Sequence, residues 1–292
     1  MEQTGRPALD DAAAVFAEVR PRLFGIAYRM LGSALDAEDL LQDVWVRWQT
    51  ADRSVVVNPA AYLATTTTRL AINANQTARA RHETYVGPWL PEPVDTSADP
   101  ALGAENVAAL EVAVLLLLEK LNPTERAAYV LREAFDYPYQ QIAEIIQTTE
   151  TTARQHVSRA RKRLAEQRKA PVSAPEQQRL LTAFVAAARA GDLDALEKLF
   201  AQDVVSYADS NGAVRGASRV PVYGAVALAK IVRAFTPRFW TGVDAVPAMI
   251  NGGHAVVCKR EGVTFAVIAL DASADGIDGL YWMMNPEKLS RL

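Results

Sequence analysis

The apolar positions of the first 84 residues follow helical spacing in three successive segments. From Val15 to Met30, apolar residues recur every three or four positions. A second apolar stripe runs from Leu40 to Trp48, behind an acidic start at Asp36 that we predict as the N-cap. A third helix begins where Asn58-Pro59 breaks the chain. Residues 12–84 are therefore predicted to form a small all-helical domain.

A proline-rich stretch separates this region from the next one. Four prolines lie between Gly87 and Pro100, so we interpret residues 85–104 as an interdomain linker. Its Trp89 and Leu90 are unusually apolar for a linker, and we expect them to dock onto another surface.

Helical patterns resume over residues 105–169. Asn122-Pro123 is a strong helix start, and Thr149 can cap a last helix that extends to about Arg168. Three helices with a short turn between the last two are typical of a helix-turn-helix. Gln147 lies in that turn where glycine is common, which predicts slight backbone strain.

The pattern changes after a second linker at 170–175. Helical segments from Gln177 onward precede five strand-like runs, and two helices on a curved sheet would form an α+β domain over 176–292. The expected fold class is multidomain: two all-α domains, the second a helix-turn-helix, and a C-terminal α+β domain. The strand-like runs are Val204–Ala208, Asp244–Ile250, His254–Lys259, Val263–Leu270 and Gly279–Met284.

Composition limits the function classes. One cysteine and three histidines in 292 residues predict no disulfide framework, no Cys/His metal site and no cofactor. No apolar run approaches the roughly 20 residues of a membrane span, and the N-terminus lacks an export signal, so we expect a cytoplasmic protein without a membrane partner. The net charge of −3 would by itself argue against nucleic-acid binding.

The charges are unevenly distributed, however. Between Arg154 and Lys169 lie seven basic residues opposed only by Glu166, whereas Asp36–Asp43 carries four acidic residues. One basic and one acidic helix predict two different macromolecular partners.

The basic helix carries the candidates for reading DNA. Ala153, Val157, Ala160 and Leu164 recur at helical intervals and should face the domain core. The start of the second helix of a helix-turn-helix enters the major groove, where Arg can pair with guanine and Gln with adenine. The alternative is a solvated basic face without a partner. The candidates for base contacts are Thr151, Arg154, Gln155, Ser158 and Arg159, and those for phosphate contacts are Arg161, Lys162 and Arg163.

The acidic segment Asp36–Trp45, D-A-E-D-L-L-Q-D-V-W, resembles the core-binding helix of extracytoplasmic-function sigma factors. Leu121–Leu164 resembles the DNA-binding fourth region of the same family, and the two matches occur in the family's order. The resemblance implies core RNA polymerase and promoter DNA as partners. The alternative for the acidic helix is an ordinary amphipathic helix with a solvated face. The implied residues are Asp36, Asp39, Gln42, Asp43 and Arg47 for the polymerase clamp, and Arg69, Asn73, Arg79 and Arg81 for the minus-ten element.

Further motifs resemble sigma factors with a fused SnoaL-like domain, namely Tyr85–Pro93, Ala187–Leu196 and Asn285–Leu289. The resemblance implies that this domain and the linker restrain or tune the DNA-binding regions. One segment departs from the relatives, because Asp209–Ala213 stands where they carry D-G-G-G followed by Arg or Lys. The implied regulatory residues are Trp89, Leu90, Pro91, Glu92 and Pro93 of the linker, and Asn285, Pro286, Glu287, Lys288 and Leu289 near the C-terminus.

We expect a sigma factor and not an enzyme. Two alternatives stay open. One is a one-component DNA-binding regulator whose C-terminal domain senses a small molecule, and the other is a SnoaL-like enzyme with a DNA-binding appendage. The enzyme would need a carboxylate or histidine in a ligand-sized cavity. The polar candidates are His254, Asp244, Asp209 and Tyr207, whereas Phe239, Trp240, Phe265, Tyr281 and Trp282 are predicted to belong to the core.

Overall fold

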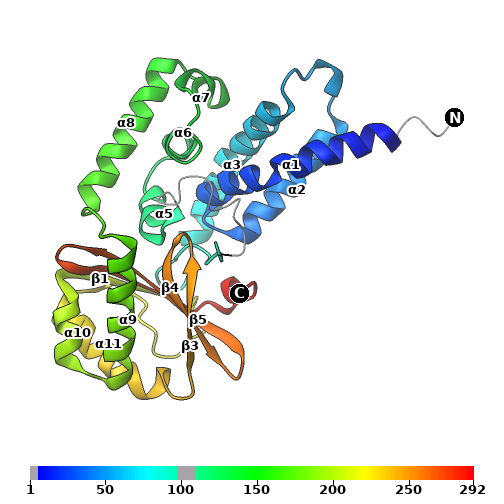
Figure 1. Cartoon of the computed structure of the whole chain (residues 1–292). Coiled ribbons are helices and arrows are strands. Elements are labelled where there is room, and N and C mark those ends of the chain that lie inside the picture. The colour runs from blue at the N-terminus through cyan, green and yellow to red at the C-terminus, as the bar shows by residue number, and fades with distance from the viewer. Residues whose placement is uncertain (1–5, 84, 98–109) are drawn as a thin grey trace. The chain divides into compact units, whose positions relative to one another are not determined.

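The computed structural model describes residues 6–83, 85–97 and 110–292, and gives the backbone alone for residues 6–10 and 76–83. The chain divides into two compact units (Figure 1). The helical unit consists of the described residues of Met1–Arg81 and Leu117–Leu164. The C-terminal unit consists of those of His82–Asp99, Leu110–Leu116 and Ala165–Leu292.

The helical unit begins with α1 (Arg6–Leu31), α2 (Ala34–Thr50) and α3 (Pro59–Glu83), with the short 3₁₀ helix η1 (Arg53–Val55) between the last two. The prediction of Asp36 as the N-cap is wrong. Ser33 caps α2, because its hydroxyl accepts a hydrogen bond from the Asp36 N–H at 3.1 Å. Asp36 lies in the first turn instead, where its charge favours the helix dipole.

The second part of the helical unit contains α6 (Pro123–Glu133), α7 (Tyr139–Ile145) and α8 (Glu150–Gln167), and α5 (Val112–Leu118) precedes it. The predicted caps are confirmed. Asn122 accepts from the Glu125 N–H at 2.8 Å, and Thr149 accepts from the Thr152 N–H at 3.1 Å. Of the region 105–169, in which helices were expected, residues 105–109 lie outside the described residues. Helices α6, α7 and α8 therefore form the expected helix-turn-helix arrangement.

A buried arginine joins the two parts of the helical unit. The Arg126 side chain is 2% exposed, and its Nη1 donates to the Met30 carbonyl at 2.5 Å and to the Asn75 side chain at 3.2 Å. Glu119 supplies the opposite charge at 2.6 Å. Asn75 also donates to the Met30 carbonyl at 2.8 Å. Removal of any partner would leave a buried polar group unsatisfied, so this junction has a defined geometry.

The C-terminal unit is an α+β fold built on a six-stranded sheet, with the order β2-β1-β6-β5-β4-β3. Strands β1 and β6 are parallel, and all other neighbours are antiparallel. The strands are β1 (Phe200–Asp209), β2 (Val222–Tyr223), β3 (Asp244–Ile250), β4 (Gly253–Arg260), β5 (Val263–Ser273) and β6 (Gly276–Met283), and the helices are α9 (Ala174–Ala190), α10 (Leu193–Leu199), α11 (Ala225–Phe239) and α12 (Pro286–Leu289).

Both faces of the sheet are buried. Because successive side chains of a strand point to opposite sides, neighbouring residues of one strand belong to different cores. Cys258 and Ile268 belong to a core shared with α9, α10 and α11. Val257 and Val267 belong to a second core on the other face, which contains Leu90 of the linker. The linker, the start of α5 and α12 thus cover one face of the sheet, while α9, α10 and α11 cover the other.

Three elements of this unit were not predicted from the sequence: α11, β2 and the four-residue helix α12. Helix α11 is a third helix on the sheet, so the expectation of two helices is wrong. Pro237 near its C-terminal end and Pro221 and Gly224 before its start hid a helical pattern that Leu228 and Val232 carry. Strand β2 contains only two residues, too few for an alternating pattern to be visible.

No described helix has the combination of length and apolar character that a membrane span requires. The helical regions and the α+β unit agree with the fold class expected from the sequence.

The strained turn yields a stability prediction. Gln147 has a φ of 56°, in the left-handed region that costs a residue with a side chain about 1–2 kcal/mol. Replacing it by glycine removes this cost but adds freedom to the unfolded chain, so Gln147→Gly should raise the free energy of unfolding by roughly 0.5–1 kcal/mol. The control Gln141→Gly, inside α7, should lower it by about 1 kcal/mol. Urea titration followed by circular dichroism measures both, and a Gln147→Gly variant less stable than the parent would contradict the strain.

Candidate functional site

The acidic helix α2 has a buried side and a charged exposed side. Ala37, Leu40, Leu41, Val44 and Trp48 are buried, which fixes the rotation of the helix. Asp39, Gln42, Asp43 and Arg47 are exposed, and Asp36 is half-buried in the first turn. Within the described part of the chain, neither Asp39 nor Asp43 forms an ion pair with a basic side chain. Of the five residues predicted to bind polymerase, four are therefore exposed and accessible to an external partner, and Asp36 is only partly accessible.

Sequence reasoning missed two apolar residues on the same side of α2. Leu35 is 55% exposed and Val46 is 57% exposed. Positions 35, 39, 42 and 46 follow intervals of 4, 3 and 4, so Leu35 and Val46 flank the charged residues in one stripe. Single exposed apolar residues are common on protein surfaces, but these two would add apolar area to a contact made through this side of α2. The signal in the sequence was the pair of apolar positions that fall outside the buried stripe.

Helix α3 places its predicted DNA-binding residues differently. Asn73 is exposed. Arg69 donates from Nε to the Ile145 carbonyl and from Nη2 to the Glu144 carbonyl, both at 2.9 Å. These carbonyls end α7, so the guanidinium caps the negative end of that helix. The side chains of Arg79 and Arg81 lie outside the described residues.

Helix α8 has the burial pattern expected of a recognition helix. Ala153, Val157 and Ala160 are fully buried and Leu164 nearly so. The opposite side is exposed, as the sequence predicted. Its exposed residues are Thr151, Arg154, Gln155, Ser158, Arg159, Arg161, Lys162 and Arg163.

Several of these arginines already have partners in the helical unit. Arg161 pairs with Glu133 at 2.6 Å, and Arg163 pairs with the buried Glu125 at 2.9 Å. Both carboxylates belong to α6, so these two arginines hold α8 against α6. Arg154 pairs with Glu150 at 2.5 Å, and its guanidinium lies 4.4 Å from the centre of the Tyr139 ring. Where both partners are exposed, as in the pair of Arg154 with Glu150, an ion pair contributes little stability and can exchange for a phosphate or base partner.

The last two basic residues of the run have another role. Arg168 pairs with Asp271 at 3.0 Å and with Glu111. Lys169 pairs with Asp203, Asp278 and Asp275 at 2.8–3.1 Å. These carboxylates all belong to the C-terminal unit. Arg168 and Lys169, which were counted among the seven basic residues but not among the predicted DNA contacts, therefore anchor the segment after α8 to carboxylates of the C-terminal unit.

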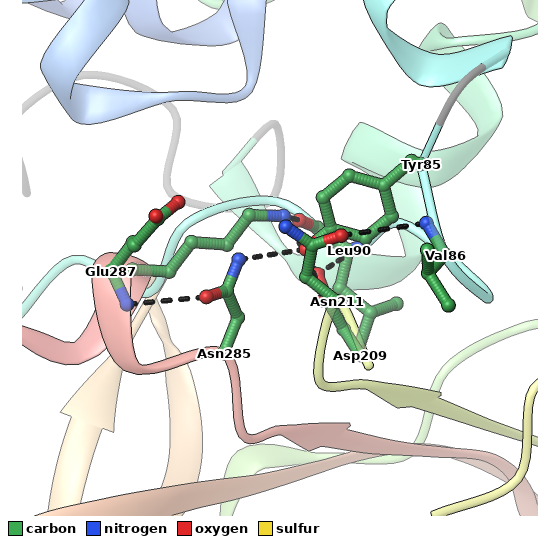
Figure 2. A network of polar contacts seen from close by, with 8 residues as sticks. Tyr85, Val86, Leu90, Asp209, Asn211, Asn285 and Glu287 are labelled. Carbon is green, nitrogen blue, oxygen red and sulfur yellow. Dashed lines mark hydrogen bonds and ion pairs between the residues drawn. The ribbon is translucent and has the colours of Figure 1, made fainter. Parts of the chain in front are cut away.

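The linker meets the C-terminal unit at one buried carboxylate (Figure 2). Asp209, which is fully buried, accepts from the Tyr85 hydroxyl at 2.5 Å and from the Leu90 N–H at 2.8 Å. Lys288 pairs with the same carboxylate at 2.6 Å and donates to the Leu90 carbonyl at 2.5 Å. Asn285 donates to the Tyr85 hydroxyl at 2.8 Å. We call these five residues the linker clasp.

Aromatic contacts and pKa shifts support the same geometry. The Lys288 ammonium lies 4.4 Å from the centre of the Trp89 ring and 5.0 Å from that of Tyr85, at cation–π distance. Burial raises the pKa of the Tyr85 phenol above its ordinary value, and the hydrogen bond to Asp209 raises this pKa further. Tyr85 therefore stays neutral, and its hydroxyl donates a hydrogen bond to the carboxylate.

The rest of the linker follows the sheet. Leu90 packs into the second core with Leu289, and Pro91, Glu92 and Pro93 are buried as well. Val94 and Asn251 exchange two hydrogen bonds of 2.9 Å, and Asp95 forms an antiparallel bridge with Ile250 of β3. The expected docking of Trp89 and Leu90 is confirmed, with Leu90 completely buried and Trp89 beneath Lys288. Pro286 and Glu287 are exposed, and the Asn285 side chain caps α12 by accepting from the Glu287 N–H at 3.1 Å.

The loop that begins at Asp209 contributes a further contact to the linker. Its Asn211 adopts a left-handed φ of 45°. Asparagine tolerates this conformation better than most residues. The Asn211 side chain also accepts from the Val86 N–H at 3.4 Å, as Figure 2 shows. Asp209 and Asn211 of this loop therefore both bind the linker.

The polar residues considered for catalysis do not converge. Tyr207 stacks on Tyr281 in the second core, and Asp209 is occupied by the linker clasp. Asp244 is exposed at the start of β3, and His254 lies beside a space of only about 20 Å³. Phe239, Trp240, Phe265 and Trp282 do belong to the core shared with the helices, but they also line a cavity. Among the described residues, no cluster of three potential metal ligands occurs.

Comparison with known proteins identifies the family of this chain. Residues 15–81 match the model for sigma-70 region 2, and residues 111–164 match that for sigma-70 region 4. The chain is 37% identical over 290 residues to the ECF RNA polymerase sigma factor SigJ of Mycobacterium tuberculosis, covering 94% of this chain and 92% of the relative. The chain belongs to the ECF sigma factors.

Other relatives agree with this assignment. The probable ECF RNA polymerase sigma factor SigI of the same organism is 31% identical over 291 residues, covering 97% of this sigma factor and 96% of the relative. The crystal structure of M. tuberculosis SigJ superposes with a TM-score of 0.76 at 30% identity, covering 95% of this chain and 98% of that one. The expected fold class is thereby confirmed across both units. As a sigma factor, the protein binds RNA polymerase and promoter DNA for transcription initiation, and it is not an enzyme.

The exposed side of α8 yields a prediction on DNA binding. If Arg154 or Arg159 pairs with a base, its replacement by alanine should weaken binding to a mapped promoter by roughly 1–3 kcal/mol and relax the preference for one base pair. Fluorescence anisotropy with polymerase holoenzyme and single-base promoter variants measures both effects. Arg179→Ala is the matched control, because Arg179 is also an exposed arginine in a helical ion pair, with Glu176, but lies in α9. Unchanged base preference in both α8 variants would contradict the assignment.

Proposed function

We propose that this protein is an alternative sigma factor whose own C-terminal unit regulates promoter recognition. Helix α2 binds core RNA polymerase, α3 and α8 contact two separate stretches of promoter DNA, and the C-terminal unit controls the chain between them through the linker. It acts in the cytoplasm, where the polymerase is. The C-terminal unit also offers a site for a small-molecule ligand. The observation that carries the proposal is the presence of the acidic and basic surfaces on separate helices of one unit.

The polymerase surface is supported by exposure and charge. Asp39 and Asp43 are exposed and form no ion pair with the described residues, so binding to a basic partner would break no ion pair seen there. Leu35 and Val46 add apolar area on both sides of these charges. Complementary charge gives orientation and rate, and the apolar area gives affinity. The combination fits a protein partner better than a solvated helix face.

The helical unit has the properties of a closed state. Arg126 joins α6 to the end of α1 and to α3, and Arg69 is held by the carbonyl end of α7. An arginine that caps α7 is not available to a phosphate. To contact two separate stretches of DNA, α3 and α8 must move apart. Promoter binding therefore competes with these internal contacts.

The linker clasp supports a role in that competition. Residues 85–97 connect the two helical regions in sequence, and most of this segment is fixed to the C-terminal unit. A docked linker shortens the tether that is free to span the distance between the two helical regions. Docking therefore favours the closed state, and release of the linker favours promoter binding.

Charge reversal tests the polymerase surface. Asp39→Arg with Asp43→Arg should reduce binding to core polymerase at least tenfold, because it replaces attraction by repulsion at a basic partner. Transcription from a mapped promoter by core polymerase plus this protein should fall in parallel. The control Asp11→Arg with Glu18→Arg reverses two exposed charges on α1 and should leave both unchanged. Undiminished binding of the α2 variant, measured by pull-down, would contradict a polymerase surface there. Transcription that needs no contact through α2 would instead favour a one-component regulator.

Disruption of the linker clasp tests the regulation. Asp209→Asn leaves Lys288 and the Leu90 N–H facing an amide and should destabilise the C-terminal unit by about 3 kcal/mol. Hydrogen exchange at residues 85–93 should accelerate, and core-dependent transcription should rise. The control Asp244→Asn changes an exposed carboxylate that lies outside the clasp and should alter neither. Faster exchange in the linker without a change in transcription would contradict the proposed restraint.

A further inference from the structure

The core shared by the sheet and α9–α11 is not completely filled. A cavity of about 410 Å³ lies between α11, the ends of β1 and β6, and the loop 213–218. This volume is more than twice that of the roughly 150 Å³ cavity that holds a benzene molecule. It falls within the range of small-molecule sites, about 300–1,000 Å³.

The wall is mainly aromatic and aliphatic. Phe235, Phe239, Trp240, Phe265 and Trp282 contribute aromatic rings, and Leu228 and Val232 contribute aliphatic side chains. Phe239 contacts three of the other rings, with centroid distances of 4.9–5.2 Å, so the wall is a packed and preformed surface. Such a surface favours an apolar ligand, because binding removes apolar area from water on both sides.

The charge of the wall has a single sign. Arg215, Arg238 and Arg260 line the cavity and are exposed, which places them at its opening. No aspartate, glutamate or histidine lines the cavity among the described residues, and none of the three arginines forms an ion pair there. A general acid or base is therefore missing from the wall, which argues for binding and not for catalysis.

One of these cations is held in place. The Arg260 guanidinium donates to the Phe239 carbonyl at 3.0 Å and lies 4.6 Å from the centre of the Phe265 ring. Its planar group is thus oriented before any ligand arrives. Arginine binds carboxylates through two parallel hydrogen bonds, and little conformational entropy is lost when the group is already fixed.

We propose that the cavity binds an amphipathic monoanion, with an aliphatic or aromatic body against the ring wall and a carboxylate-type head group at Arg238 and Arg260. This inference rests on the proposed small-molecule site and names its ligand class. The wall also adjoins the linker clasp. Ala208 and Met284 line the cavity next to Asp209 and Asn285, and the Met284 N–H donates to the Asp209 carbonyl at 2.7 Å.

Calorimetric titration of the full chain with octanoate, octan-1-ol and octylammonium, below their micelle concentrations, tests the ligand class. Octanoate should bind about tenfold more tightly than octan-1-ol, because a charge-assisted hydrogen bond replaces a neutral one, and octylammonium should not bind. Decanoate should bind more tightly than octanoate, by about fourfold for each added methylene. Trp240 and Trp282 lie in the wall, so tryptophan fluorescence should change upon binding.

Variants separate the head-group contact from the cavity. Arg238→Gln with Arg260→Gln should abolish the preference for octanoate over octan-1-ol. The control Lys230→Gln with Arg233→Gln removes the same charge from exposed positions of α11 outside the cavity and should retain the preference. Arg260 also contacts Phe239 and Phe265, so its replacement could disturb the wall of the cavity. A second head-group variant therefore combines Arg215→Gln with Arg238→Gln, two residues that are exposed and unpaired. This variant should weaken the preference for octanoate. Ile231→Trp, at a half-exposed wall position, should block binding of all ligands.

The outcomes are distinguishable. Equal affinity for octanoate and octan-1-ol, or a preference that persists in both head-group variants, would overturn the anionic class while leaving a ligand site of other chemistry. If none of the three compounds binds, and the titrations of the Ile231→Trp variant are the same as those of the parent chain, the ligand site itself would be overturned. Neither result depends on polymerase, so the proposed sigma activity is decided separately by transcription.

Discussion

The organisation of the C-terminal unit depends on a carboxylate that is buried without being isolated. Asp209 receives a hydroxyl, a backbone N–H and an ammonium group, which come from the linker and from the C-terminal segment. A buried charge is tolerated only when it is paired and hydrogen-bonded. Because each of its partners is separated from it by more than 70 residues, the need to satisfy one charge brings three distant segments together.

The helical unit also contains a buried charge that is paired and hydrogen-bonded. Arg126 is buried among two backbone or amide oxygens and one carboxylate, and it joins two regions that each contribute to promoter binding. Arg69 and the arginines of α8 are held by carbonyl or carboxylate oxygens at the surface. Internal oxygens thus occupy the guanidinium groups of residues that we propose to contact DNA. Exposed pairs of this kind are weak, so a polyanion can displace them, whereas the buried Arg126 junction requires the two regions to separate.

The two faces of the sheet in the C-terminal unit are covered by different elements. One face is covered by the linker and closed by Leu90 and Leu289. The other is covered by α9, α10 and α11 and retains a cavity. Strand β1 contributes to both, because Ala208 lines the cavity and Asp209 holds the linker. A ligand on one side and a linker on the other would therefore contact adjacent residues of a single strand.

The sequence by itself determined the elements that local physics controls. Helical periodicity placed the buried sides of α2 and α8, Asn122 and Thr149 capped the predicted helices, and the positive φ of Gln147 followed from its place in a turn. The acidic and basic motifs could also be recognised from the sequence, because the residues of each motif are close together along the chain. Tertiary structure alone decided which side chains meet. Nothing local pairs Asp209 with Lys288, assigns Arg168 and Lys169 to carboxylates of the C-terminal unit, or buries Asn75 against Arg126. These contacts join residues far apart in the chain, and their energy arises only when folding removes both partners from water.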